Sequence, residues 1–142
     1  MIYQLSVFLE NKFGRLNEIL GIIARENVHI VASTVSDTSE FGILRMIVSD
    51  TVRAEQALLE SNVSVRKSEV LAISTTCKAG ALAEVIQPFT TAGISIEYMY
   101  SFCAPNGKYA IVMRVNNSDA ALEVVRRNNF SCFTESEILE TL

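Results

Sequence analysis

Hydrophobic residues recur at helical spacing in two stretches of the chain that lie 66 residues apart. The spacing is i, i+3, i+4 and i+7, which places four apolar side chains on one face of an amphipathic helix. The two sets are Leu16, Ile19, Leu20 and Ile23, and Leu82, Val85, Ile86 and Phe89. The pattern therefore predicts one helix in each half of the chain and indicates an internal repeat.

Runs of β-branched and aromatic residues surround both predicted helices in the same order. Each copy has a strand before the helix, two strands after it, a second helix that starts near a capping residue, and a short closing strand. A turn containing Gly42 or Gly107 is expected between the second and third strands. The ranges are 4–10, 27–35, 43–50, 51–62 and 63–65 in copy one, and 69–75, 93–101, 110–117, 118–129 and 130–133 in copy two.

The order strand, helix, strand, strand, helix, strand predicts an α+β fold made of two ferredoxin-like βαββαβ units in tandem. The expected domains are residues 1–68 and 69–142. Each unit would form an antiparallel sheet with its two helices on one face and its second strand at an edge. Because unpaired edges favour association, we expect the two sheets to lie side by side, joined through their second strands into eight strands. The tail 134–142 reads either as a further strand or as a short helix capped by Thr134 and Glu137.

Composition excludes several classes of function. The net charge is −4, which gives no basic surface for nucleic acid or anionic membranes. The N-terminus shows no basic leader, and no apolar run approaches the length of a membrane span, so a cytoplasmic protein is expected. Three widely spaced cysteines predict neither a metal site nor a disulfide framework, and Cys103 and Cys132 are expected in the core. No cofactor is expected.

A glycine lies between the first strand and the first helix of each copy, in "ENKFGRL" (10–16) and in "TCKAGAL" (76–82). At such a corner the first amides of the helix lack intrahelical partners, and the helix dipole favours an anion, for example a carboxylate. Glycine lets a ligand approach the backbone closely. A tight turn without any ligand explains a single glycine equally well, and a short motif alone does not separate the two interpretations.

The stretch "ENKFGRLNEILGIIARENVHI" (10–30) resembles the start of an ACT domain, a small ligand-sensing module of amino-acid-regulated enzymes. The corner is especially similar to that of the regulatory domain of D-3-phosphoglycerate dehydrogenase. Both copies match in outline, so the resemblance covers nearly the whole chain. Phe13 and Ala79 stand where the family has proline, which makes the corner less rigid. The resemblance implies a non-catalytic regulatory protein that binds a free amino acid where two such domains meet.

Carried over to this sequence, the resemblance implies two sites, each combining the corner of one copy with the start of the second strand of the other. The higher-ranked site contains Asn11, Lys12, Phe13, Gly14, Arg15, Leu16, Ser95, Ile96 and Glu97. The second contains Cys77, Lys78, Ala79, Gly80, Ala81, His29, Ile30 and Val31. Neither includes catalytic or metal-binding residues. His29, the only histidine, is as readily explained by a structural hydrogen bond.

Two other functions remain open from the sequence. A ligand-free module for dimerisation or protein docking would use the same fold, and a homodimer or a regulated enzyme would be its partner. An acylphosphatase-like enzyme would grip phosphate with Arg15 and Asn11, although "NKFGR" does not reproduce that loop. Neither a Ser-His-Asp set nor a Cys-His pair is recognisable, so catalysis is not expected.

Overall fold

The structure, a computed structural model, describes residues 1–37, 40–140 and 142. It divides into two compact units, here called the first module, Tyr3–Ser68, and the second module, which begins at Glu69 and also includes Met1 and Ile2. Each module is a mixed α+β unit with an antiparallel sheet, which confirms the predicted fold class. Of the tail 134–142, residue 141 lies outside the described residues.

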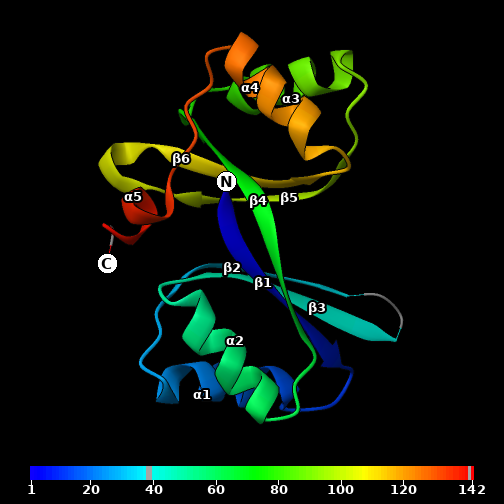
Figure 1. Ribbon diagram of the computed structural model, residues 1–142, viewed down its shortest axis with the longest axis vertical. Helices are drawn as coiled ribbons and strands as arrows, with labels where there is room; N and C mark the ends of the chain where they lie inside the picture. The colour runs from blue at the N-terminus through cyan, green and yellow to red at the C-terminus, as the bar shows by residue number, and fades with distance from the viewer. Residues whose placement is uncertain (38–39, 141) are drawn as a thin grey trace. The chain divides into compact units, whose positions relative to one another are not determined.

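In the first module β3 is the middle strand, paired antiparallel with both β1 and β2. The register places Leu9 opposite Gly42 and Val35 opposite Leu44. Helices α1 and α2 lie on the same face of this sheet (Figure 1). The elements are β1 (Ile2–Glu10), α1 (Arg15–Arg25), β2 (Ile30–Asp37), β3 (Phe41–Val48) and α2 (Thr51–Glu60).

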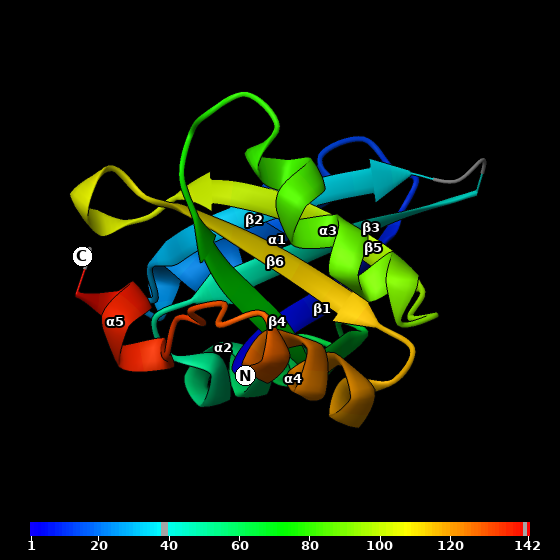
Figure 2. The same ribbon diagram turned by 90° about the horizontal axis from the view of Figure 1, so that it is seen from above.

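The second module repeats this arrangement, with β6 between β4 and β5 (Figure 2). Thr75 lies opposite Tyr109, and Ser101 lies opposite Ile111. These pairs are the counterparts of Leu9–Gly42 and Val35–Leu44 in the first module. The elements are β4 (Val65–Thr75), α3 (Ala81–Thr91), β5 (Ile96–Cys103), the 3₁₀ turn η1 (Pro105–Gly107), β6 (Tyr109–Val115), α4 (Ser118–Arg127) and α5 (Glu135–Leu139).

The closing strands differ from the prediction. The expected strands 63–65 and 69–75 form one continuous strand, β4, because no turn residue interrupts the chain between them. The expected strand 130–133 is reduced to a bridge between Ile73 and Cys132, next to a hydrogen bond from Ser74 N–H to the Ser131 carbonyl. The tail then forms the short helix α5, whose capping box joins Thr134 and Glu137.

Both cores lie between a sheet and its helices. In the first module the fully buried side chains of α1 are Ile19 and Ile23, and in the second module Phe89 of α3 takes the corresponding place. Leu16 and Leu82, which the helical pattern assigned to the core, are 38% and 46% exposed. They stand in the first helical turn, beside the corner loop rather than over the middle of the sheet.

The five helices begin in two different ways. Side chains cap α2, α4 and α5, where Asp50, Asn117 and Thr134 each accept a hydrogen bond from a backbone amide of the first turn. Helices α1 and α3 instead follow Gly14 and Gly80, which have φ of 80° and 85° and provide no side-chain cap. Only glycine adopts this left-handed conformation at little cost. The two glycine corners therefore leave helix amides available.

Three sequence expectations need correction or remain predictions. Gly42 lies in β3 rather than in a turn, where a Cβ atom would stand 3.3 Å from Cβ of Leu9. Cys103 is exposed instead of buried, because β5 is paired on one side only among the described strands. Cys132 is half-buried, and this burial raises the pKa of its thiol. The pairing of the two second strands with each other stays a prediction.

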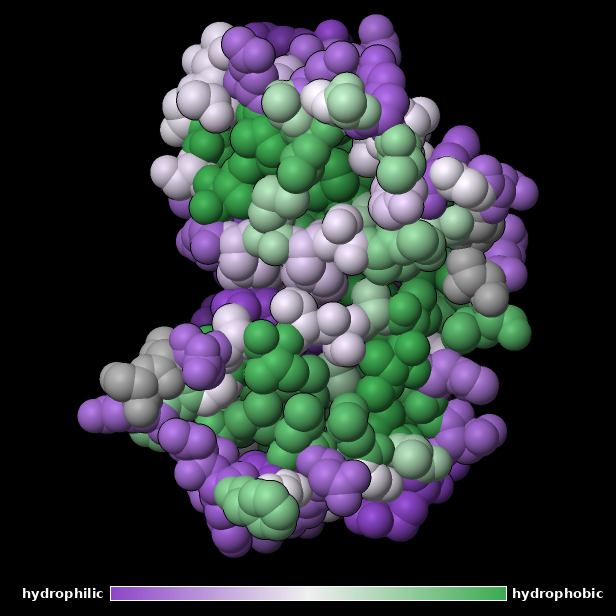
Figure 3. Space-filling model, turned by 180° about the vertical axis from the view of Figure 1, so that it is seen from behind, coloured by the Kyte–Doolittle hydropathy of each residue, from purple (hydrophilic) through white to green (hydrophobic). Residues whose placement is uncertain are grey.

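Apolar side chains reach the surface of both modules (Figure 3). In the first module Phe8, Val35 and Phe41 are each about half exposed. Surfaces of this kind are typical of interaction or ligand sites when they are contiguous. Val35 and Phe41 lie close to the glycine corner of α1, where the candidate site is found.

Candidate functional site

Each glycine corner leaves two amides of its helix unpaired. At the start of α1 the amide of Arg15 donates to the Lys12 carbonyl and that of Glu18 to the Gly14 carbonyl, whereas those of Leu16 and Asn17 have no partner among the described residues. The start of α3 repeats this arrangement, with the amides of Leu82 and Ala83 unpaired in the part of the chain that the structure describes. Such amides attract an electronegative group.

A pocket of about 210 Å³ opens at the first corner, here called the first pocket. It lies between the corner loop, the first turn of α1, the end of β2 and the start of β3. Two of its walls come from segments that the β2–β3 register brings to the corner. The lining residues are Leu9, Glu10, Asn11, Lys12, Arg15, Leu16, Val35, Asp37, Phe41 and Gly42.

Arg15 has an unusual environment in the first pocket. Its side chain is only 16% exposed, and one terminal nitrogen forms a 3.1 Å ion pair with Glu18. Its Nε is buried and has no hydrogen-bond partner among the described residues. Leaving a buried donor unpaired costs about 1–3 kcal/mol, and more when the group is charged. A ligand oxygen placed at this nitrogen would remove the cost.

The first pocket carries charges of both signs. Lys12 and Arg15 supply two cations, and Glu10 and Asp37 supply two carboxylates. A zwitterionic molecule suits such a site, since its carboxylate and its ammonium each find a partner of opposite charge. The pocket is smaller than the range typical of drug-sized ligands, which limits it to a small molecule.

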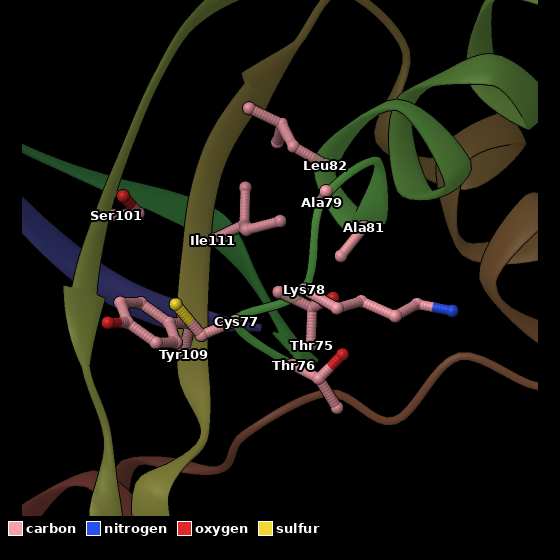
Figure 4. A pocket seen from close by; sticks show the side chains of 10 residues that line it. All are labelled: Thr75, Thr76, Cys77, Lys78, Ala79, Ala81, Leu82, Ser101, Tyr109 and Ile111. Carbon is pink, nitrogen blue, oxygen red and sulfur yellow. The ribbon is translucent and has the colours of Figure 1, made fainter.

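The second module has a counterpart of about 360 Å³, here called the second pocket (Figure 4). It is lined by Thr75, Thr76, Cys77, Lys78, Ala79, Ala81, Leu82, Ser101, Tyr109 and Ile111. Eight lining positions are equivalent in the two pockets: Leu9/Thr75, Glu10/Thr76, Asn11/Cys77, Lys12/Lys78, Arg15/Ala81, Leu16/Leu82, Val35/Ser101 and Gly42/Tyr109. The duplication has therefore preserved the place of the pocket and changed its chemistry.

The hydroxyl group of Tyr109 is hydrogen-bonded to the side chains of Cys77 and Cys103. These bonds, first that of Cys77, and the negative charge that the sulfur atoms carry when ionised, disfavour the phenolate. They raise the pKa of Tyr109 from 10.0 to about 12. Cys103 is the cross-strand partner of Tyr109, whereas Cys77 belongs to the glycine corner. The tyrosine thus links the corner loop to β5.

An alkaline absorbance titration is expected to show one of the four tyrosines ionising with a midpoint near pH 12. Because the folded-state pKa lies above the unfolded value, this group stabilises the fold fully below pH 10, and the contribution is lost as pH rises towards about 12. Tyr109→Phe should remove the component, and Cys77→Ser should lower its midpoint more than Cys103→Ser. Equal midpoints in all three thiol backgrounds would contradict the assignment.

The structure places most of the predicted corner residues at the two pockets. Asn11, Lys12, Arg15 and Leu16 line the first, and Cys77, Lys78, Ala79 and Ala81 line the second. The two glycines shape the corners without lining the cavities. Phe13 is fully exposed and does not line the first pocket.

The predicted residues at the starts of the second strands have backbone roles. The amide of His29 donates to Ser49 Oγ at 2.9 Å, and the amide of Ser95 donates to Asn116 Oδ1 at 3.1 Å. Glu97 forms a 3.6 Å ion pair with Arg114. Ile30 and Val31 do not line the first pocket of their own module, nor do Ser95, Ile96 and Glu97 line the second. Their part in a site shared between modules stays a prediction.

Sequence reasoning missed the residues contributed by the ends of the second strands and the starts of the third. Val35, Asp37 and Phe41 complete the first pocket, and Ser101, Tyr109 and Ile111 complete the second. The repeat contained a usable signal, because these positions follow the same 66- and 67-residue offsets as the corners. Only the strand register shows that they face the corner.

Two further features were searched for throughout the described residues. They contain no helix long and apolar enough to cross a membrane. Nor do they contain a group of three or more His, Cys, Asp or Glu side chains placed to hold a metal ion.

A family model described as an ACT domain pair matches residues 1–142, so the chain belongs to this family. The resemblance seen in the sequence is thereby confirmed. ACT domains are regulatory modules. A comparison with curated proteins gave no match.

Solved structures agree with this assignment. Protein BT0572 from Bacteroides thetaiotaomicron is 39% identical, with a TM-score of 0.89 over 97% of this chain and 95% of its own. The ligand-free regulatory subunit of aspartate kinase from Thermus thermophilus is 12% identical, with a TM-score of 0.63 over 88% and 90%. E. coli aspartokinase III in complex with lysine and aspartate is 20% identical, with a TM-score of 0.50 over 88% of this chain and 29% of its own. The last two likenesses concern the fold alone.

Proposed function

We propose that this protein is a non-catalytic, cytoplasmic regulatory protein that binds a free amino acid at the first pocket and senses its level. The observation that carries the proposal is the buried, unpaired Nε of Arg15 in a small pocket with charges of both signs. Membership of the ACT family and the aspartokinase neighbours, one of them solved with two amino acids, support the same conclusion.

In the proposed complex the ligand carboxylate accepts hydrogen bonds from Arg15 Nε and from the unpaired amides of Leu16 and Asn17. The ammonium group donates to Asp37 or Glu10 on the opposite side of the pocket. Each buried charge then has a partner, which is the condition for binding a zwitterion away from water. The volume of about 210 Å³ favours amino acids with small side chains.

The two modules serve as the domains 1–68 and 69–142 of this sensor. We also propose that Ser95, Ile96 and Glu97 close the site of the first corner, as the family resemblance implies. An amino acid bound to both modules then stabilises one mutual arrangement of them, by as much as its affinities for the alternative arrangements differ. A regulated enzyme or a second copy of the chain reads out that arrangement.

Thermal unfolding with each of the twenty amino acids tests the proposal, followed by calorimetric titration of those that respond. A ligand present at about 100 times its dissociation constant should add about 2.7 kcal/mol to the free energy of unfolding. One or a few small amino acids are expected to respond. No response from any of the twenty would refute the proposal and favour a module that only docks proteins.

A further inference from the structure

The second pocket differs from the first in one decisive substitution. Ala81 occupies the position of Arg15, so the long side chain that lines the first pocket has no counterpart in the second. The second pocket is larger by about 150 Å³, the difference between 360 and 210 Å³, although Tyr109 replaces Gly42. Its volume reaches the lower end of the range found for small-molecule sites.

Apolar surface dominates the interior of the second pocket. Ile111, only 2% exposed, the rings and methyl groups of Tyr109, Ala79 and Ala81, and the half-exposed Leu82 surround it. In Figure 4 the side chains of Leu82 and Ile111 lie next to each other above Tyr109. A ligand in this place would cover an exposed leucine and gain about 25 cal/mol for each Å² of apolar surface removed from water.

No charged side chain is available to a ligand inside the second pocket. Lys78 is its only charged lining residue, and it forms a 3.4 Å ion pair with Glu84. Figure 4 shows its amine pointing away from Tyr109 and Ile111. The remaining polar lining groups are neutral hydroxyls and a thiol, at Thr75, Thr76, Ser101, Tyr109 and Cys77. An acidic or basic side chain would lose its hydration there without gaining a partner.

We propose that the second pocket is a separate binding site for a small molecule with an uncharged aliphatic body of about four to six carbon atoms. The duplicated modules would then have diverged into two sites of different chemistry, a charged one and an apolar one. This inference goes beyond the amino-acid site of the first module and stands without it. Leucine and a branched aliphatic carboxylate share the required body, and the experiment distinguishes them.

The probes are leucine and 4-methylpentanoate, which have the same branched body with and without the ammonium group, and glycine and acetate, which lack that body. Calorimetric titration of the full chain should detect at least one of the first two, and neither of the last two at the second pocket. If only 4-methylpentanoate binds, the ligand is a carboxylate without an amine. If leucine binds as well, the ligand is an aliphatic amino acid.

Matched variants locate the binding. Ser101→Phe enlarges an exposed side chain at the second pocket, and Val35→Phe makes the equivalent change at the first. Ser101→Phe should weaken the aliphatic probe at least tenfold, and Val35→Phe should leave it unchanged. Ala81→Arg, which copies the residue at the equivalent position of α1, gives a second means of filling the cavity and should have the effect of Ser101→Phe.

The inference is overturned if neither aliphatic probe binds at about 10 mM, a concentration that detects even millimolar dissociation constants. It is also overturned if glycine or acetate competes with the aliphatic probe, or if Ser101→Phe and Ala81→Arg both fold and bind normally. Failure of the first site gives a different result: none of the twenty amino acids would then require the first pocket, while 4-methylpentanoate remained sensitive to Ser101→Phe.

Discussion

Arg15→Met is expected to lower the affinity of the first pocket for its amino acid by about 10- to 150-fold, because a hydrogen bond to a charged group contributes about 1.5–3 kcal/mol. Methionine keeps the length and the apolar stem of arginine but provides no donor. Nε of Arg15 is buried and unpaired among the described residues, so its main partner is expected to be the ligand. Calorimetric titration of both proteins measures the difference.

The same substitution should leave the free protein as stable as before or stabilise it by up to about 2 kcal/mol, since it removes a buried donor without a partner. The ion pair with the largely exposed Glu18 is lost at a cost of about 0–1 kcal/mol. Urea unfolding without ligand checks this expectation. Loss of binding together with unchanged stability is the signature of a residue that serves the ligand.

Arg53→Met is the matched control, because Arg53 lies in the same module, is 60% exposed and pairs with Glu26 away from the pocket. It should change neither the affinity nor, by more than about 1 kcal/mol, the stability. Equal affinities of the wild-type and Arg15→Met proteins would remove Arg15 from the site. A strong destabilisation by Arg15→Met would show that the arginine serves the fold instead.

Phe89→Ala should lower the free energy of unfolding by about 3–5 kcal/mol, as expected for an aromatic side chain lost from a core. Phe89 is fully buried and stacks on Phe130, with ring centroids 6.3 Å apart and planes inclined by 21°. It fastens α3 to the segment that follows α4, and alanine would leave a cavity there. The loss is measured by urea or thermal unfolding.

Leu122→Ala on α4 is the control for Phe89→Ala. Leu122 is 41% exposed, and substitutions at such positions usually change stability by no more than about 0.5 kcal/mol. The contrast separates the core of the second module from its surface. A Phe89→Ala protein as stable as the Leu122→Ala protein would contradict the packing described for α3.

The sequence was informative where local pattern and duplication carried the information. Period-3.6 spacing predicted α1 and α3, and the repeat predicted the order of the strands. The exceptions were the leucines of the first turn, Leu16 and Leu82, which a helical pattern assigns to the core because it reports only which face is apolar. Their actual place at the pockets depends on where the helix lies over the sheet.

By itself, the sequence determined the two α+β modules, the glycine corners and the absence of a basic surface, because spacing, glycine and net charge act locally or add up along the chain. Only the tertiary structure decided which residues face each corner. Val35 and Ser101 are far from Arg15 and Ala81 in sequence, and antiparallel register brings them to the pockets. The unpaired nitrogen of Arg15 is likewise a property of packing, since burial and missing partners exist only once distant segments surround a side chain.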